Sequence, residues 1–166
     1  MNLYVVRHAE ALPMGRGIVR DADRPLSARG EHDAALVGRV LSMGEPAART
    51  IASSPLLRAR RTAEIIAGQF ADPPQVSLWP ILQPGIENRD VLGRAKEQAE
   101  DPVILVAHQP DLTEFVSWLV ADAPAEIAFP PGSVASIVIA HSIAGTGARL
   151  QWIITPKLVS LLHPEW

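Results

Sequence analysis

The sequence contains no cysteine among its 166 residues. This absence excludes thiol catalysis, disulfide bonds and every zinc or iron–sulfur site that needs a cysteine ligand. Because disulfides are rare in reducing compartments, their absence fits a cytoplasmic protein, and this is the localisation that we expect.

The sequence also lacks a segment typical of membrane insertion. Its longest uncharged stretch, from Ile127 to Ala148, is interrupted by Pro130, Pro131 and Gly132, which favours a buried strand with flanking turns over a membrane-spanning helix. The N-terminus has no basic start, and its apolar run is too short for a signal peptide. We therefore expect no membrane association.

Basic residues are not in excess, because 15 Lys and Arg stand against 18 Asp and Glu, and the net charge is −3 with neutral histidines. A chain of this charge has no general electrostatic attraction to nucleic acid, so we expect no nucleic-acid partner. Any anion that the protein binds must be held by a local cluster of arginines.

The sequence does contain enough apolar material for one core. Apolar residues make up 48% of the chain and charged residues 20%, which is close to the average of globular proteins. A length of 166 residues is typical of one domain, and we expect a single domain over residues 1–166.

Short segments typical of strands alternate with longer helical ones. The expected strands cover residues 3–6, 49–53, 76–78, 103–107, 136–140 and 150–154. The expected helices run from Ser27 as N-cap to Gly44, from Ser54 as N-cap with Pro55 at the first helical position, over 88–99, and onward from Pro110. This alternation predicts an α/β fold: a three-layer α/β/α sandwich with a mostly parallel central sheet.

Basic side chains follow the predicted strands at the edge where parallel sheets bind their ligands. Arg7 and His8 end the first strand, and His108 follows the most apolar strand. Arg58 lies in the first turn of the helix that begins after Ser54. The sequence therefore predicts that these four side chains meet at one edge of the sheet.

Arg58 gives a second indication of an anion site. It stands with Arg60 and Arg61 at a helix start, where cations oppose the helix dipole. A bound anion would make this arrangement favourable, because helix-start N–H groups and guanidinium groups both attract it. We interpret Arg60 and Arg61 as solvated, with Arg61 near Glu64, and assign the anion to Arg58.

Two histidines and two arginines around one anion indicate phosphoryl transfer. A neutral imidazole can attack phosphorus, because it carries a free lone pair when its other nitrogen donates to a fixed acceptor. Arg7, Arg58 and a protonated His108 are suitable donors to the phosphoryl oxygens. These cations can do the work of magnesium, so we expect no metal and no cofactor.

Four segments carry a resemblance to a known family. They are Leu3–Ala11 with Arg7-His8, Asp23–Gly30 with Pro25-Leu26-Ser27, Ser53–Ala63 with Ser54-Pro55 and Arg58, and Val106–Leu112 with His108-Gln109-Pro110. In order and spacing they resemble the histidine phosphatase (phosphoglycerate mutase-like) superfamily. The small size and the His-x-Pro-x-Leu form resemble its phosphohistidine phosphatase branch, typified by SixA. The resemblance extends from Leu3 to about Leu119.

The resemblance implies a phosphoglycerate mutase-like fold and a role for each residue. His8 becomes the phosphorylated nucleophile, Arg7 and Arg58 the phosphate clamps, and His108 the second catalytic histidine. Among the acidic residues near the site, Asp21 is the candidate general acid. The sequence departs from the family where Ala9 replaces glycine, and where the segment 79–85 lacks the glutamate that serves many members as general acid.

We accordingly predict a metal-independent phosphatase that acts on phosphohistidine in proteins through a phosphorylated His8. Its partners would be a phosphorylated protein or a small phosphate monoester, with inorganic phosphate or a similar anion in the pocket. Two alternatives stay open: a small-molecule phosphomonoesterase, and a catalytically weak module that binds phosphoproteins. A mutase is least expected, because the chain has little sequence to spare for a lid over the substrate.

Overall fold

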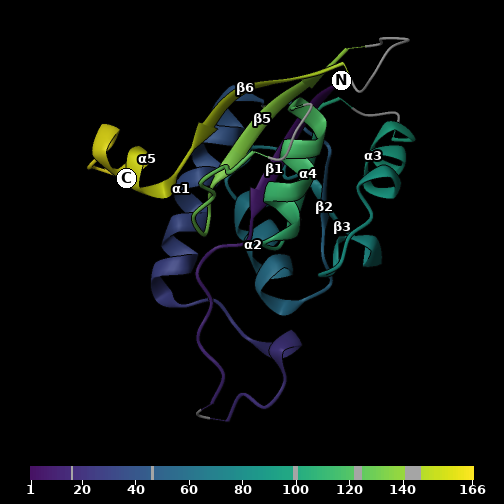
Figure 1. Cartoon of the computed structure of the whole chain (residues 1–166). Coiled ribbons are helices and arrows are strands. Elements are labelled where there is room, and N and C mark those ends of the chain that lie inside the picture. Colours follow the sequence, from purple (N-terminus) through teal and green to yellow (C-terminus); the bar gives the residue numbers. More distant parts are fainter. Residues whose placement is uncertain (16, 46, 99–100, 122–124, 141–146) are drawn as a thin grey trace.

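A mixed β-sheet forms the middle layer of the protein in the computed structural model (Figure 1). The structure describes residues 1–15, 17–45, 47–98, 101–121, 125–140 and 147–166. Within these residues the strands are β1 (Asn2–Arg7), β2 (Thr50–Ser53), β3 (Gln75–Leu78), β4 (Val103–Ala107), β5 (Val134–Ile139) and β6 (Ala148–Ile154). The helices are α1 (Ala28–Gly44), α2 (Leu57–Ala67), α3 (Asn88–Lys96), α4 (Asp111–Val120) and α5 (Pro156–Leu162), with short 3₁₀ helices η1 at Asp21–Asp23 and η2 at Pro80–Leu82.

The strand order is β3-β2-β4-β1-β5-β6. The first four strands in this order run parallel to their neighbours, whereas β5 is antiparallel to β1 and β6 is antiparallel to β5. The prediction of a mostly parallel sheet is confirmed. Arg7 lies opposite Ala107 in the β1–β4 register, so His8 and His108 follow at the same level of two adjacent strands.

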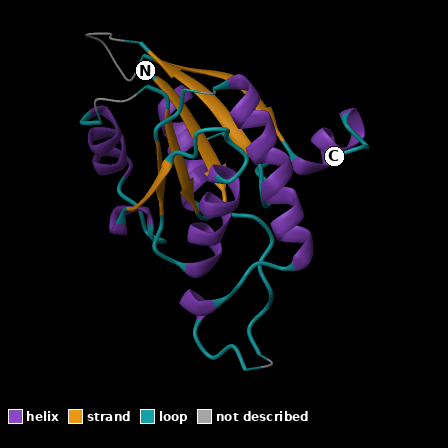
Figure 2. Cartoon of the chain, turned by 180° about the vertical axis from the view of Figure 1, so that it is seen from behind, coloured by secondary structure: helices purple, strands orange, loops and turns teal. Residues whose placement is uncertain are grey.

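Helices lie on both sides of the sheet (Figure 2), and each face of the sheet carries one apolar cluster. Successive side chains of a strand point to opposite faces, so Leu3 and Val5 belong to one cluster while Tyr4 and Val6 belong to the other. Helices α3 and α4 complete the first cluster, with Leu92 and Phe115 among their buried residues. Helices α1 and α2 complete the second cluster, and the predicted three-layer α/β/α sandwich is confirmed.

The two predicted N-caps have different outcomes. Ser27 caps α1 as expected, because its hydroxyl oxygen accepts the N–H of Gly30 at 3.0 Å. The prediction that Ser54 caps α2 is wrong, since α2 begins at Leu57 with Leu56 as its N-cap. Ser54 stays with the sheet instead, because its N–H donates to the carbonyl of Val106 at 2.9 Å.

The other helix boundaries differ in detail from the expectation. α3 ends at Lys96, short of the predicted residue 99, and residues 99–100 lie outside the described part of the chain. α5 was not predicted; Thr155 caps it by accepting the N–H of Leu158 at 3.2 Å, and Pro156 occupies its first turn. No helix in the described residues is long and apolar enough to span a membrane.

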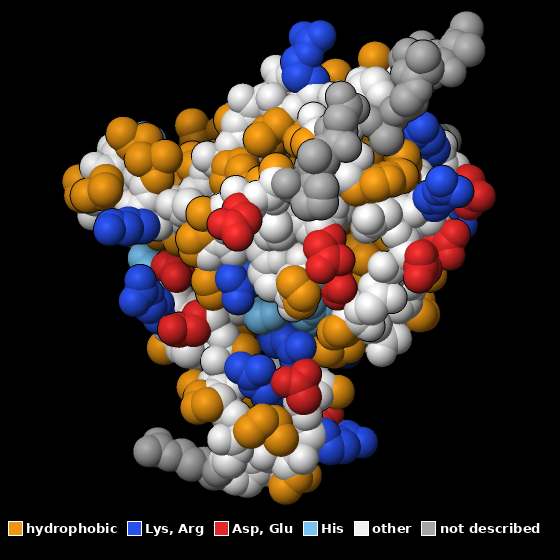
Figure 3. All heavy atoms as spheres, in the orientation of Figure 1, with side chains coloured by type: hydrophobic (Ala, Val, Ile, Leu, Met, Phe, Trp, Pro, Cys, Tyr) orange, Lys and Arg blue, Asp and Glu red, His pale blue; other side chains and the backbone are white. Residues whose placement is uncertain are grey.

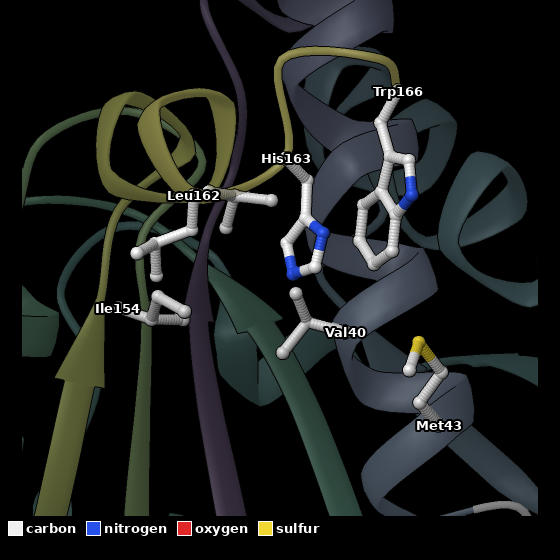
Figure 4. Close-up of a pocket in the computed structure, with 7 residues that line it drawn as sticks. Val40, Met43, Ile154, Leu162, His163 and Trp166 are labelled. Atoms are coloured by element: carbon white, nitrogen blue, oxygen red, sulfur yellow. The ribbon is translucent and has the colours of Figure 1, made fainter.

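An apolar recess lies where α5 and the C-terminal residues meet α1 and β6 (Figure 4). It is lined by Val40, Met43, Ile154, Val159, Leu162, His163 and Trp166. The imidazole of His163 stacks on the indole of Trp166 with 4.1 Å between ring centroids. No arginine or lysine belongs to this lining, so the recess lacks the groups that hold a phosphate.

Candidate active site

The four predicted site residues lie together at the carboxyl ends of β1 and β4. The rings of His8 and His108 have centroids 5.1 Å apart. Arg58, which is 50 positions from His8, reaches its Nε2 atom with Nε at 3.1 Å. Histidine and basic side chains are visible together near the middle of the face in Figure 3, above the projecting segment of the chain.

His8 is held in one tautomer. Its Nδ1 lies 2.7 Å from the carbonyl oxygen of Ala9, which can only accept a hydrogen bond, so Nδ1 carries the proton. Nε2 accepts from the N–H of Arg58 and therefore presents its lone pair. Burial, followed by the charges of Arg58 and Arg7, lowers the pKa of His8 to about 4, so the ring is neutral at pH 7.

Arg58 is a buried cation at the start of α2. Only 5% of the residue is exposed, and its Nη1 donates to the carbonyl of Asp21 at 2.9 Å. Its Nη2 lies 3.0 Å from the carboxylate Oδ2 of Asp21. The carboxylate of Asp21 therefore accepts from the guanidinium of Arg58, the side chain that we expect to bind phosphate.

Asp21 lies between two arginines in the 3₁₀ turn that precedes α1. Desolvation raises its pKa, but hydrogen bonds and charge from Arg24 and Arg58 outweigh this effect, and the pKa lies below its ordinary value. The carboxyl group is ionised near neutral pH as a result. An ionised carboxylate has no proton to give, which weighs against Asp21 as general acid in this arrangement.

Arg7 is fixed by the loop before β5. Its Nη1 donates to the carbonyl of Phe129 at 2.8 Å, while its Nε is buried without a partner in the described residues. Burial lowers the pKa of Arg7, although a guanidinium keeps its charge throughout the range where proteins are folded. A buried N–H without a partner beside His8 is a suitable donor to a bound anion.

His108 is neutral in the described arrangement, in contrast to the protonated donor expected from the sequence. Its pKa is lowered to about 3 by burial and by the neighbouring His8 and Arg58, while Asp21 acts in the opposite direction. A phosphoryl dianion would favour the protonated ring, so protonation of His108 requires the anion. Its Nε2 lies 2.7 Å from the hydroxyl oxygen of Ser54.

Two supporting residues of the site, Thr62 and Ser54, were not predicted from the sequence to contact it. The hydroxyl of Thr62 accepts the N–H of Ala9 at 3.1 Å and donates to the carbonyl of Arg58 at 2.7 Å, so it joins the segment after His8 to α2. Ser54 contacts His108 as described. Both residues lie in the segment Ser53–Ala63, which the sequence analysis had singled out. Their hydroxyl contacts with distant segments, however, cannot be predicted from spacing along the chain.

The departures from the family pattern have a structural account. The added Cβ of Ala9 is buried against Leu26 and Ala34, so the alanine is accommodated. Segment 79–85 contributes the buried side chains of Trp79 and Leu82 to the core, and it contains no carboxylate. Asp21, which comes from a different segment, is the acid that contacts Arg58.

The charged residues around the site form hydrogen bonds and ion pairs with neighbouring side chains. Arg24 donates to Asp21 at 3.1 Å, and the hydroxyl of Ser27 donates to Glu10 at 2.6 Å. The interpretation of Arg60 and Arg61 as solvated is confirmed, since both are exposed, with Arg60 paired to Glu64 at 2.9 Å. Arg61 pairs chiefly with Glu31 at 3.0 Å and more weakly with Glu64 at 3.8 Å.

Comparison with known proteins is consistent with this geometry. The family model "Histidine phosphatase superfamily (branch 1)" matches residues 3–83. An uncharacterized protein from Picosynechococcus sp. is 33% identical over 173 residues, which cover 100% of this chain and 98% of that protein.

Solved structures are similar over nearly the whole chain. The protein histidine phosphatase SixA complexed with tungstate has a TM-score of 0.80 at 22% identity, covering 95% of this chain and 98% of that one. A SixA from Nakamurella multipartitia, described as a putative phosphohistidine phosphatase, has a TM-score of 0.74 at 25% identity, covering 93% and 95%. The predicted phosphoglycerate mutase-like fold is confirmed.

Proposed function

This chain belongs to the histidine phosphatase superfamily, and from this premise we propose that it is a phosphatase that hydrolyses phosphohistidine in proteins through a phosphorylated His8. The observation that supports the proposal best is the state of His8. Its ring is neutral, its Nδ1 proton is bound by the Ala9 carbonyl, and its Nε2 lone pair faces the guanidinium of Arg58. This is the form of imidazole that attacks phosphorus.

The reaction proceeds in two balanced steps. In the first, the lone pair of His8 Nε2 forms a bond to phosphorus, and the bond between phosphorus and the substrate imidazole breaks. The substrate ring carries a proton from solvent on its other nitrogen, so it keeps the electron pair of the broken bond and leaves as neutral imidazole. In the second step water attacks phosphorus, His8 leaves with its electron pair, and phosphate and a proton are released. Arg7 and Arg58 stabilise the oxygens of the transferring group in both steps.

The choice of phosphohistidine follows from the acid–base chemistry of the site. An alkoxide needs a proton from a positioned acid to leave at neutral pH, and such an acid contributes about 10²–10⁴-fold in rate. Imidazole has a conjugate acid with a pKa of about 6.5, so it leaves with little help. Asp21 is ionised between Arg24 and Arg58, and segment 79–85 contains no carboxylate, so the site favours the easier leaving group.

The test combines turnover with trapping. A phosphohistidine-containing protein is incubated with the enzyme in the presence of a chelator, and the reaction is quenched within milliseconds. We expect turnover and an acid-labile phosphoryl label on His8, both abolished by His8→Ala. Full activity of His8→Ala overturns the mechanism, and tight binding of the phosphoprotein without turnover identifies a binding module instead.

A further inference from the structure

Ser54 contacts the ring of His108 from the loop between β2 and α2. Its hydroxyl oxygen is 2.7 Å from His108 Nε2, and the residue is fully buried. The N–H of Ser54 donates to the carbonyl of Val106 at 2.9 Å, and the N–H of Leu56 donates to the Ser54 hydroxyl oxygen at 3.4 Å. The hydroxyl is therefore fixed by the backbone of both β4 and the loop that enters α2.

The second ring nitrogen of His108 has no such contact. Nδ1 is buried and has no hydrogen-bond partner in the residues that the structure describes. Ser54 is thus the polar side chain that can orient this ring before the substrate arrives. Because the Ser54 hydroxyl oxygen already accepts the N–H of Leu56, the hydroxyl donates its own proton to Nε2 of the neutral ring, which places the ring proton on Nδ1. When Nε2 is protonated as well, the hydroxyl can rotate and accept from it.

We propose that Ser54 is a positioning residue for His108: its hydroxyl holds the ring in one orientation and one tautomer, and keeps its hydrogen bond when the ring takes up a proton. The importance of this contact for turnover rests on the proposed phosphatase function. Ser54 acts only through His108.

The charged and titratable groups that face His108 come from three other segments. They are His8 at the end of β1, Arg58 of α2 and Asp21 of η1. His8 and Arg58 disfavour a proton on His108, and Asp21 favours it. A phosphate bound near the two histidines adds negative charge, which stabilises the protonated form of His108. The Nε2–H of the protonated ring then needs a hydrogen-bond acceptor. The Ser54 hydroxyl, 2.7 Å from Nε2, is that acceptor.

The adjacent Ser53 provides a matched control. It is equally buried, and its hydroxyl donates to the carbonyl of Ser54 at 2.9 Å. Ser54→Ala and Ser53→Ala thus each remove one buried hydroxyl from the same strand end, but only the first removes a contact with His108. A purely structural role would affect both variants alike.

The experiment reads the His108 ring directly, by nitrogen-15 NMR of histidine-labelled protein with and without saturating tungstate. We expect one dominant tautomer in the wild type and in Ser53→Ala, and a mixture of tautomers in Ser54→Ala. In the tungstate-bound protein, Ser54→Ala should titrate His108 at lower pH, because a protonated ring that loses its acceptor is destabilised more than a neutral ring that loses its donor. Ser54→Thr retains the hydroxyl and should restore the wild-type spectrum.

The kinetic arm uses the phosphohistidine protein. Ser54→Ala should lower kcat about tenfold with KM within about twofold of the wild type, a part of the total contribution of acid–base catalysis, whereas Ser53→Ala should be close to the wild type. If a folded Ser54→Ala variant shows the same His108 nitrogen shifts as the wild type, the proposal is overturned. A mixture of His108 tautomers in the wild type also overturns it, and this measurement requires no variant. If the enzyme turns over no phosphoprotein while the tautomer still depends on Ser54, the proposed function fails and the positioning role stands.

Discussion

At the scale of single residues, buried imidazoles connect the site to the stability of the protein. The pKa of His8 is lowered to about 4, and that of His108 to about 3, chiefly by burial. The unfolded chain titrates both near their ordinary value of about 6.5. Between about pH 6.5 and 4 these histidines are protonated in the unfolded state but stay neutral in the folded state. The stability that the neutral histidines allow above about pH 6.5 is therefore lost as the pH falls toward 4.

We expect the free energy of unfolding to fall between pH 6.5 and 4, by up to about 3 kcal/mol for His8 alone at the lower end of this range. Urea unfolding at pH 7 and at pH 4.5, in buffers without phosphate, measures the difference. His8→Asn, which cannot be protonated, should show a smaller pH dependence than the wild type. Equal pH dependence in both proteins would show that His8 is not held neutral by the fold.

Arg58 is the second residue whose contribution can be isolated. Its guanidinium contacts His8 and Asp21 from a buried position, whereas the nearby Arg60 is exposed and paired with Glu64. Arg58→Ala should weaken binding of inorganic phosphate or tungstate by about 1.5–3 kcal/mol, the range of a hydrogen bond to a charged group. Calorimetric titration measures this loss, and Arg60→Ala serves as the control with unchanged affinity. A tungstate-bound crystal structure with Arg58 turned away from the anion would contradict the assignment.

At the scale of elements, the start of α1 is packed against the backbone that follows His8. The N–H of Ser27 donates to the carbonyl of Glu10 at 2.9 Å, and a Cβ added at Gly30 would collide with that same carbonyl oxygen. Glycine at this position thus permits the close approach of helix and loop. The loop in turn carries Ala9, whose carbonyl orients His8.

Gly30→Ala should consequently destabilise the protein by about 1–3 kcal/mol, the cost of overpacking, and should also reduce phosphatase activity by displacing the loop. Gly93 is the matched control, because it lies within α3 and a Cβ added there would meet open space. Gly93→Ala should stabilise the helix by about 0.5–1 kcal/mol. Thermal and urea unfolding compare the two variants, and a neutral Gly30→Ala would show that the loop can move without loss.

Helix α2 supplies two contacts one turn apart. The side chain of Arg58 donates to Nε2 of His8, and the hydroxyl of Thr62 accepts the N–H of Ala9, so one helix contacts both the ring of His8 and the backbone after it. The remaining buried face, with Ala59, Ala63 and Ile66, packs on the sheet. The packing of the apolar face of α2 on the sheet thereby determines the positions of Arg58 and Thr62.

At the scale of the whole molecule, the site lies at the edge of the sheet, and a long segment between β1 and α1 projects beyond it (Figures 1 and 2). This segment carries Asp21, whose carboxylate forms an ion pair with Arg58. The ionised carboxylate of Asp21 has no proton to donate to a leaving group, which supports the proposed phosphohistidine substrate.

The expected order of kcat/KM is phosphohistidine protein first, aryl phosphates next and alkyl phosphates last, because the leaving groups become progressively more basic. The comparison is made in the wild type and in Asp21→Asn, which removes the carboxylate from Arg58 with little change in size. We expect Asp21→Asn to retain phosphohistidine turnover. If the alkyl ester is the better substrate and Asp21→Asn destroys that activity, Asp21 is a competent general acid and the protein is a small-molecule phosphomonoesterase.

The sequence by itself determined the α/β class, the mostly parallel sheet and the elements that carry the candidate site. Local signals were sufficient here: the apolar run at residues 103–107 became β4, and Ser27 became the cap of α1. The meeting of His8, Arg58 and His108 could also be predicted, because each follows or begins an element whose end lies at one edge of the sheet.

Only the tertiary structure decided the states of these groups. Ser54 is not the cap that its neighbour Pro55 suggested, because directly after β2 its N–H donates to the carbonyl of Val106 in β4, and its hydroxyl contacts His108. Asp21 is ionised and His108 neutral because of arginines and of burial contributed by distant segments. Spacing along the chain predicts which element a residue occupies, whereas pKa values and tautomers depend on neighbours through space, and these exist only in the folded protein.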